Sequence, residues 1–400
     1  MKPHLLIILN RLVVGGQSID TVPLANELKD QYDIVIAYGE KEKDEEEFSD
    51  LIENSSGIAF HKIHSLKRSV NPLNDVIAIF SLYKLMRKFK PVIVHTHGSK
   101  PGVNGRIAAW FANVPVIIHT FHGHLFHSYY NKFVSSSIIR LEKLLSRITS
   151  KIIVLSEQQR KEICDRYKIV KWDKVKLIPL GIDEKFYNTN AELLRNDFRN
   201  EYQLSEDCIA IGVIGRIVPV KNHKLFAGIA IKMLQSPLKD RVKFFIVGDG
   251  YSKKDLENIL TQASVAFTDG KNHDHAKVFF TSWIIPVTNI LHGLDIVALT
   301  SLNEGTPLSL IEAQACAKPV VAANVGGVKD TFVNKESGFL IEDHNEAEFV
   351  NKLTLLTESN QMRKKMGCAG RAFVQKNFSK LVEVNAFREL YAGSIAAMNK

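Results

Sequence analysis

Residues 295–315, DIVALTSLNEGTPLSLIEAQA, place an apolar strand, a polar loop and a helix in immediate succession. The β-branched run ends at Thr300, and Pro307 with Ser309 marks a helix start because proline suits the first helical position. The unpaired amides and the positive dipole end of such a helix form an anion site. This stretch therefore predicts a parallel sheet whose ligand site follows a strand.

The same alternation of short apolar runs and longer helical patterns fills the rest of the chain. Runs typical of buried strands lie at 5–9, 34–37, 92–95, 116–119, 152–155, 176–178, 209–214, 242–247, 278–280, 296–300, 320–323 and 339–341. In the first half, helical patterns lie at 20–30, 75–88, 102–111, 135–147 and 157–166. This order is typical of parallel βαβ units. At 400 residues, we expect an α/β protein of two doubly wound domains with a cleft between the facing sheets.

The composition is that of a globular chain with a large core. Hydrophobic residues make up 45% and charged residues 24%, which excludes collagen-like and disordered chains. The apolar runs are far shorter than the ~20 residues of a membrane-spanning helix, and the run at 5–9 is too short for a secretory signal. The cysteines are scattered without zinc-site spacing, which predicts a reducing cytoplasm: Cys164, Cys208, Cys316 and Cys368.

The positive charge is concentrated in the first half of the chain. Residues 61–176 hold 21 lysines and arginines against 6 acidic residues, although the whole chain carries only +9. Because no zinc-finger spacing, aromatic RNA-binding stretch or basic zipper helix accompanies this charge, we expect no nucleic-acid partner. Residues 129–151 repeat leucine and isoleucine at helical spacing between basic side chains; such a helix either lies on anionic lipid or simply buries one face. The acidic stretch at 40–53 predicts a solvated helix.

Two strand-end loops of the first half carry candidate binding residues. Gly15 and Gly16 follow the opening strand and permit close approach to a phosphate, although a plain tight turn explains them almost as well. The second loop, HTFHGH at 119–124, supplies His119, His122 and His124, with His127 behind them. No acidic partner accompanies these histidines, so one imidazole donating a hydrogen bond to a ligand is preferred over a metal site. His95 and His97, on the neighbouring strand, are candidates to support it.

Two loops of the second half carry charges suited to a nucleotide sugar. In GRIVPVKN at 215–222, Gly215 opens a turn from which Arg216 and Lys221 can neutralise a pyrophosphate, unless they are ordinary surface charges. Glu304 and Glu312 lie on either side of the predicted anion site, where one carboxylate would accept from hexose hydroxyls and the other from ribose hydroxyls. The alternative is a helix-capping Glu304 and an exposed Glu312.

These residues resemble the family 4 glycosyltransferases of the GT-B fold. The resemblance covers nearly the whole chain and rests on motifs that occur in order after strands: the glycine loop at 15–16, HTHGSKPGVNGR at 95–106, HTFHGH at 119–124, IPLGID at 178–183, GRIVPVKN at 215–222, VGDG at 247–250, the E-x7-E pair Glu304 and Glu312, and NVGGVKD at 324–330. Two departures affect only local contacts: Leu180 replaces the usual asparagine, and GGQSIDTV lacks the acidic residue often found after the glycines.

The resemblance implies an acceptor-binding domain at 1–182, joined by the last helix at 379–400, and a nucleotide-sugar-binding domain at 183–378. It implies His122, Arg216, Lys221 and Glu304 as the catalytic group, with His122 near C6 of the sugar and Glu304 on its hydroxyls. The implied substrate-binding set is Gly15, Gly16, Gly215, Ser282, Trp283, Gly305, Thr306, Pro307, Leu308, Ser309 and Glu312. Transfer with retention, without metal or other cofactor, is also implied, and the chain contains no D-x-D motif.

The HTFHGH loop and the basic first half look most like members that build bacterial surface polysaccharides such as capsule and O-antigen. The implied reaction moves a hexose or N-acetylhexosamine from a UDP-sugar to a lipid-linked saccharide, in the cytoplasm or at the inner face of the cell membrane. Three alternatives stay open: a UDP-sugar epimerase of the same fold, a non-catalytic nucleotide-sugar binder, and a basic membrane-surface protein without a ligand pocket.

Overall fold

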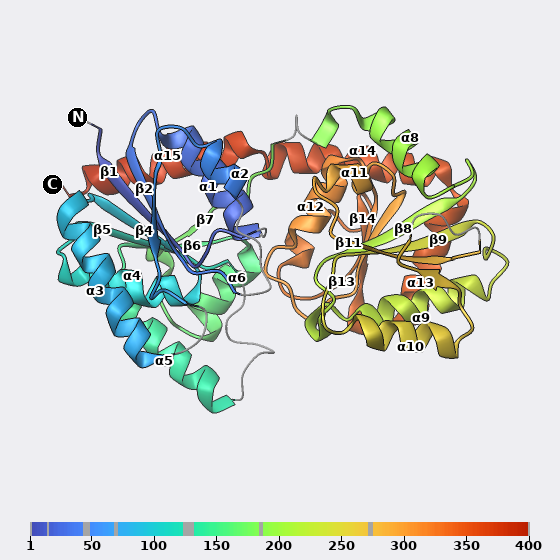
Figure 1. Cartoon of the computed structure of the whole chain (residues 1–400), viewed down its shortest axis with the longest axis horizontal. Helices are drawn as coiled ribbons and strands as arrows, with labels where there is room; N and C mark the ends of the chain where they lie inside the picture. Colours follow the sequence, from blue (N-terminus) through green and yellow to red (C-terminus); the bar gives the residue numbers. More distant parts are fainter. Residues whose placement is uncertain are drawn as a thin grey trace. The chain divides into compact units, whose positions relative to one another are not determined.

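The computed structural model describes residues 2–13, 16–42, 49–67, 71–122, 132–183, 187–270 and 275–398 (Figure 1). Two compact units result: Met1–Gly181 with Lys380–Lys400, here the N-terminal unit, and Ile182–Ser379, here the C-terminal unit. These bounds differ by one residue from those expected from the sequence. The ligand roles expected for the two domains, and a cleft between them, stay predictions.

The N-terminal unit is built on a seven-stranded parallel sheet with the order β3-β2-β1-β4-β5-β6-β7. Its strands are β1 (His4–Leu9), β2 (Asp33–Gly39), β3 (Ala59–Ile63), β4 (Ile93–His97), β5 (Val116–Thr120), β6 (Lys151–Val154) and β7 (Val175–Leu177). β1 pairs with both β2 and β4. The chain adds β2 and β3 on one side of β1 and β4 to β7 on the other, so the strand order reverses between β1 and β4. Ligands of doubly wound sheets bind at such a point.

The C-terminal unit repeats this plan with the order β10-β11-β9-β8-β12-β13-β14. Its strands are β8 (Ile209–Ile214), β9 (Val242–Val247), β10 (Phe267–Thr268), β11 (Val278–Ser282), β12 (Ile296–Leu299), β13 (Val320–Ala323) and β14 (Gly338–Ile341). All neighbouring strands in this sheet are parallel. The corresponding switch point lies between β8 and β12.

Helices cover both faces of each sheet (Figure 1). The described α-helices are α1 (Gly16–Leu28), α2 (Ser49–Glu53), α3 (Pro72–Phe89), α4 (Ser99–Phe111), α5 (Lys132–Ile148), α6 (Glu157–Lys161), α8 (Ala191–Glu201), α9 (His223–Leu234), α10 (Lys253–Gln262), α11 (Thr288–Leu291), α12 (Leu308–Ala315), α13 (Glu346–Glu358), α14 (Asn360–Asn377) and α15 (Lys380–Ala396). Side chains of β1 alternate between the two faces: Leu5 and Ile7 pack against α1 and α15, whereas Leu6 and Ile8 pack against α3 and α4. Burial on both faces explains why this strand is apolar throughout.

Two expectations about elements need correction. The edge strands β3 and β10 were not expected, because their sequences mix polar and apolar residues, as suits an edge exposed to water. The acidic stretch at 40–53 is not one helix: β2 ends at Gly39, and within this stretch the structure describes a helix only at α2 (Ser49–Glu53). Residues 43–48 lie outside the described part of the chain.

The basic helix α5 buries only part of its apolar pattern, and contact with lipid stays a prediction. Leu145 is buried, whereas Leu141 and Leu144 are 38% and 56% exposed. The apolar pattern therefore serves partly for packing and partly as an exposed apolar surface among basic residues. In the part of the chain that the structure describes, no helix is both long and apolar enough to span a bilayer.

Candidate functional site

The switch point of the C-terminal unit brings Lys221 and Glu304 together. Lys221 ends a single turn, η3 (Pro219–Lys221), in the loop after β8, and Glu304 lies in the loop after β12. The Nζ atom of Lys221 lies 2.6 Å from Oε1 of Glu304, and the hydroxyl of Ser301 donates to the same oxygen at 2.6 Å. Lys221 remains 26% exposed and can therefore also reach a ligand. Arg216 is exposed and makes no ion pair with any described residue.

Glu304 is not a helix cap, so that alternative interpretation of the residue is wrong. Its carboxylate is engaged by Lys221 and Ser301, and its backbone carbonyl accepts from the amide of Gly327 at 3.1 Å. The loop is thus fixed on both sides of the carboxylate. Lys221 and Ser301 therefore set the position of the Glu304 carboxylate in the described structure.

The anion site expected at the start of α12 has a slightly different geometry. Pro307 is the N-cap residue, with extended backbone at φ −72° and ψ 103°, and the helix begins at Leu308 rather than at the proline. Proline preorganises the turn before the helix here instead of occupying the first helical position. The Oγ1 atom of Thr306 is buried and has no hydrogen-bond partner among the described residues. A hydroxyl of this kind beside free helix amides suits a ligand oxygen.

The neighbouring loops after β9 and β11 form a close-packed rim. Gly248 has φ +132°, and a Cβ there would lie 2.2 Å from the carbonyl oxygen of Gly215 and 3.5 Å from the Trp283 ring. Only glycine fits this position. Trp283 is 49% exposed, and Ser282 holds a left-handed conformation at φ +55°. Ser282 and Trp283 belong to the implied substrate-binding set, and their part in substrate binding stays a prediction.

Glu312 is buried in α12, so the alternative of an exposed Glu312 is also wrong. Its Oε1 atom accepts a hydrogen bond of 2.7 Å from the hydroxyl of Tyr187. Burial raises the pKa of Glu312 to about 7, although the hydrogen bond from Tyr187 opposes the shift. Among the described residues Tyr187 is the one donor to this buried carboxyl, which leaves it unused acceptor capacity. That capacity matches the predicted contact with ribose hydroxyls.

The switch point of the N-terminal unit is lined with histidines. His95 and His97 project from one face of β4, where His95 binds the Tyr391 hydroxyl through Nδ1 and the Thr120 hydroxyl through Nε2, both at 2.7 Å. His119 lies on the opposite face, hydrogen-bonded to Thr96. Gly16 begins α1, whereas the predicted Gly15, His124 and His127 lie outside the described residues.

The described histidines of this cluster are neutral at pH 7. Burial lowers the pKa of His95 to about 3 and that of His97 and His119 well below the usual range. Burial also lowers the pKa of His122, with Asp20 acting in the opposite direction. Neutral rings donate and accept hydrogen bonds instead of supplying charge. Among the described residues, no group of three or more histidine, cysteine or acidic side chains is arranged to hold a metal ion.

Two family models match the chain: "Glycosyltransferase Family 4" at residues 14–186 and "Glycosyl transferases group 1" at residues 195–373. The chain is also 32% identical over 335 residues to the UDP-Gal:alpha-D-GlcNAc-diphosphoundecaprenol alpha-1,3-galactosyltransferase of Escherichia coli, covering 82% of each chain. The chain belongs to the family 4 glycosyltransferases. A second relative of this glycosyltransferase is the capsular polysaccharide biosynthesis glycosyltransferase CapM of Staphylococcus aureus, at 25% identity over 82% of this chain and 83% of CapM.

Solved structures confirm the fold of the glycosyltransferase. Anabaena HepE in complex with UDP and glucose has a TM-score of 0.81 at 18% identity, covering 98% of this chain and 100% of HepE. Sucrose-phosphate synthase from Thermosynechococcus elongatus has a TM-score of 0.81 at 19% identity, covering 99% and 100% of the two chains. At this identity the likeness shows the fold alone. The predicted pair of Rossmann-like domains, the GT-B fold, is therefore confirmed.

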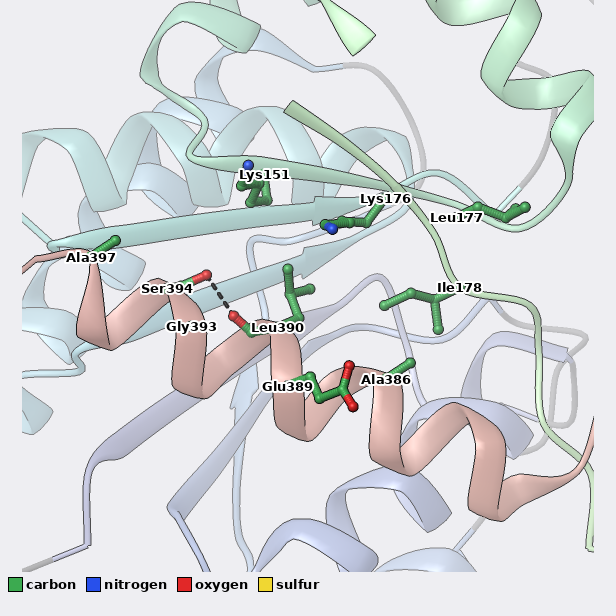
Figure 2. Close-up of a pocket in the computed structure, with 10 residues that line it drawn as sticks. All are labelled: Lys151, Lys176, Leu177, Ile178, Ala386, Glu389, Leu390, Gly393, Ser394 and Ala397. Carbon is green, nitrogen blue, oxygen red and sulfur yellow. Dashed lines mark hydrogen bonds between the residues drawn. The ribbon is translucent and has the colours of Figure 1, made fainter. Parts of the chain in front are cut away.

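A groove of about 490 Å³ opens elsewhere in the glycosyltransferase, between α15 and the strands β6 and β7 (Figure 2). Its lining consists of Lys151, Lys176, Leu177, Ile178, Ala386, Glu389, Leu390, Gly393, Ser394 and Ala397. None of these belongs to the predicted site. The groove is therefore separate from the candidate site residues of the N-terminal unit.

Two residues that hydrogen-bond to predicted site residues were not singled out from the sequence: Ser301 and Tyr187. Ser301 lies in the quoted strand-end loop, three residues before Glu304, and could have been found from that spacing. Tyr187 lies 125 residues before its partner Glu312, and no periodic pattern in the sequence connects the two. The roles of the predicted site residues in substrate binding stay predictions.

Glu312→Gln is expected to stabilise the glycosyltransferase at alkaline pH. The folded protein, with the pKa of Glu312 at about 7 against an ordinary 4.5, binds a proton that the unfolded chain releases. The contribution of Glu312 to the free energy of unfolding is therefore fully present below pH 4.5. It is lost as the pH rises through 7, and the total loss is about 3 kcal/mol. Urea unfolding at pH 5 and pH 8 should show the advantage of Glu312→Gln only at pH 8. Glu358→Gln, an exposed change on α13 of the same unit, should show no such pH dependence.

Proposed function

We propose that the chain is a retaining, metal-independent glycosyltransferase that moves a hexose or N-acetylhexosamine from a UDP-sugar to a hydroxyl of a lipid-linked saccharide in bacterial surface-polysaccharide synthesis. The observation that carries the donor half is the Lys221–Glu304 pair of 2.6 Å at the switch point of the C-terminal unit. Lys221 and Arg216, with the amides of α12, would neutralise the pyrophosphate. Glu304 would turn to accept from sugar hydroxyls once the diphosphate takes over its lysine.

The relatives support the choice of substrates. The E. coli enzyme is named for transfer of galactose from UDP to a GlcNAc-diphosphoundecaprenol, and HepE has been solved with UDP and glucose. Lys221, Arg216 and the amides of α12 would supply the positive charge that a divalent cation supplies in metal-dependent enzymes. The leaving phosphate can then take the proton of the acceptor hydroxyl on the same face of the sugar, which gives retention without a separate base.

Incubation with UDP-galactose and a GlcNAc-diphosphate lipid, with and without EDTA, tests the proposal. We expect UDP release and an α-linked disaccharide lipid in equal amounts, at the same rate in both conditions. A product of inverted configuration would overturn the assignment as a retaining enzyme, and a rate abolished by EDTA would overturn the assignment as a metal-independent one. An epimer formed from UDP-galactose alone would favour the epimerase. Binding of UDP-sugar without transfer or hydrolysis would favour the non-catalytic binder.

A membrane surface is the proposed location of the acceptor. One side of α3 exposes a stripe of large apolar residues at helical spacing, Leu73, Val76, Ile77 and Phe80, of which Leu73 is 70% exposed. α3 packs on α4, and α4 packs on α5, whose exposed Leu141 and Leu144 lie between basic residues. Exposed apolar side chains beside lysine and arginine suit an anionic lipid surface, which here would be the inner face of the cell membrane.

The double variant Ile77→Ser with Phe80→Ser is expected to lower vesicle binding at least fivefold, because each substitution removes apolar area from the contact with lipid. Co-sedimentation with phosphatidylglycerol vesicles at low salt measures it. The control is Leu193→Ser, at an exposed leucine on α8 of the C-terminal unit, which should bind like the wild type. Failure of wild-type protein to sediment with anionic vesicles would end the membrane proposal but leave the transfer reaction untouched.

A further inference from the structure

Two histidines of the N-terminal unit are joined by a direct hydrogen bond. His97 is the last residue of β4 and is 1% exposed, and His122 follows the end of β5 by two residues. Nδ1 of His97 lies 2.8 Å from Nε2 of His122. Both rings are neutral at pH 7, so each carries one N–H, and only one of the two facing nitrogens is the donor.

The second nitrogen of His97 decides the direction of this bond. Nε2 of His97 is buried and has no hydrogen-bond partner in the described part of the chain. A buried N–H without an acceptor is rarer and costs more free energy than a buried lone pair without a donor. The proton of His97 therefore belongs on Nδ1, where it donates to Nε2 of His122.

We propose that His97 is a positioning residue that fixes His122 in the Nδ1–H tautomer. With Nε2 occupied as an acceptor, neutral His122 must carry its own proton on Nδ1. His122 then offers a hydrogen-bond donor to its ligand, so the atom it recognises is an acceptor oxygen of a sugar hydroxyl or of a phosphate. The identity of the ligand rests on the proposed function, whereas the tautomer of His122 does not.

The surroundings hold His97 in place for this role. Its ring packs on that of His95 with centroids 4.0 Å apart, and both nitrogens of His95 are engaged, by Tyr391 of α15 and Thr120 of β5. Asp20 favours a charged His122, yet its carboxylate is paired with Lys380 at 3.3 Å. The larger effect of burial keeps His122 neutral, which is the state in which tautomers matter.

The tautomer can be measured on the unliganded full chain. Long-range proton–nitrogen NMR spectra of the protein labelled with 15N-histidine distinguish a protonated from a bare ring nitrogen, and His122→Asn identifies the signals of His122. We expect His122 with Nδ1 protonated and Nε2 bare at pH 7. A wild-type His122 protonated on Nε2 overturns the proposal without any further variant.

Two variants of similar size separate a positioning role from a packing role. Asparagine places an amide nitrogen where Nδ1 of histidine lies, so His97→Asn should keep His122 in the Nδ1–H tautomer. His97→Leu fills the space without a donor, so it weakens the preference for Nδ1–H, and the Nε2–H tautomer that isolated histidine side chains prefer in water should become detectable for His122. An unchanged tautomer in His97→Leu would contradict the proposal.

Activity gives the second readout. Loss of one neutral hydrogen bond to the ligand should lower kcat/KM about five- to tenfold in His97→Leu, whereas His97→Asn should stay within about twofold of the wild type. A role in packing alone predicts the reverse order, because leucine suits a buried site better than asparagine. If no transfer is detected in any variant, the proposed function fails while the NMR result still decides the tautomer.

Discussion

Lys221→Ala is expected to lower kcat for sugar transfer by about 10²- to 10³-fold. When the bond from the anomeric carbon to phosphate breaks, negative charge accumulates on the departing UDP. A fixed ammonium stabilises this charge more in the transition state than in the bound donor, so the loss should appear in kcat more than in KM. Initial rates of UDP release at several donor concentrations separate the two parameters.

The matched control for this change is Lys224→Ala, three residues along the chain. Lys224 forms an exposed ion pair of 3.0 Å with Asp255, on the surface of α9 and α10, and its loss should change kcat by less than about twofold. Because Glu304 loses its counter-charge in Lys221→Ala, thermal unfolding must accompany the kinetics. A folded Lys221→Ala protein that keeps more than a tenth of wild-type kcat would contradict the role of Lys221 as the cation for the leaving group.

The central strands could be predicted from the sequence almost to the residue. β8, β9 and β13 have the expected bounds, because a strand buried on both faces is apolar at every position. The edge strands β3 and β10 escaped prediction for the converse reason: one side of an edge strand meets water, and polar residues such as His61 and Lys62 interrupt the pattern. The other two edge strands, β7 and β14, were expected, so apolar runs miss only part of the border of a doubly wound sheet.

The candidate site was predictable where its residues share a loop or follow adjacent strands. Lys221 and Glu304 come from the ends of β8 and β12, which the topology makes neighbours, and they pair as closely as that order suggests. Contacts set by tertiary packing were not predictable. Neither the bond from Tyr187 to Glu312 nor the direct bond between His97 and His122 leaves a trace in residue spacing.

Arg106 is a further case of a residue whose role only packing reveals. It closes the HTHGSKPGVNGR motif, yet its side chain is 0% exposed and its Nη2 atom donates to both oxygens of Glu142 at 2.9 and 2.8 Å. Nε of Arg106 also donates to the carbonyl of Gly102. The pair fastens α5 to α4, and so holds the basic helix against the rest of the N-terminal unit.

Glu142→Leu is expected to destabilise the protein by about 3–5 kcal/mol, because it leaves a buried guanidinium without its counter-charge. Burial already lowers the pKa of Arg106, and only Glu142 opposes that effect. For a unit of this size the melting temperature of the N-terminal unit should fall by roughly 6–20 °C. Hydrogen exchange of the α4 and α5 amides should become faster, whereas exchange in the C-terminal unit should not change.

The double variant Arg106→Met with Glu142→Leu decides whether the charge or the packing is responsible. Replacing a whole buried ion pair by apolar side chains is often neutral, since the desolvation cost of both ions disappears together with their attraction. The double variant should therefore recover most of the stability lost in Glu142→Leu. A double variant as unstable as the single one would show that the shape of the two side chains, and not their charge, joins α4 to α5.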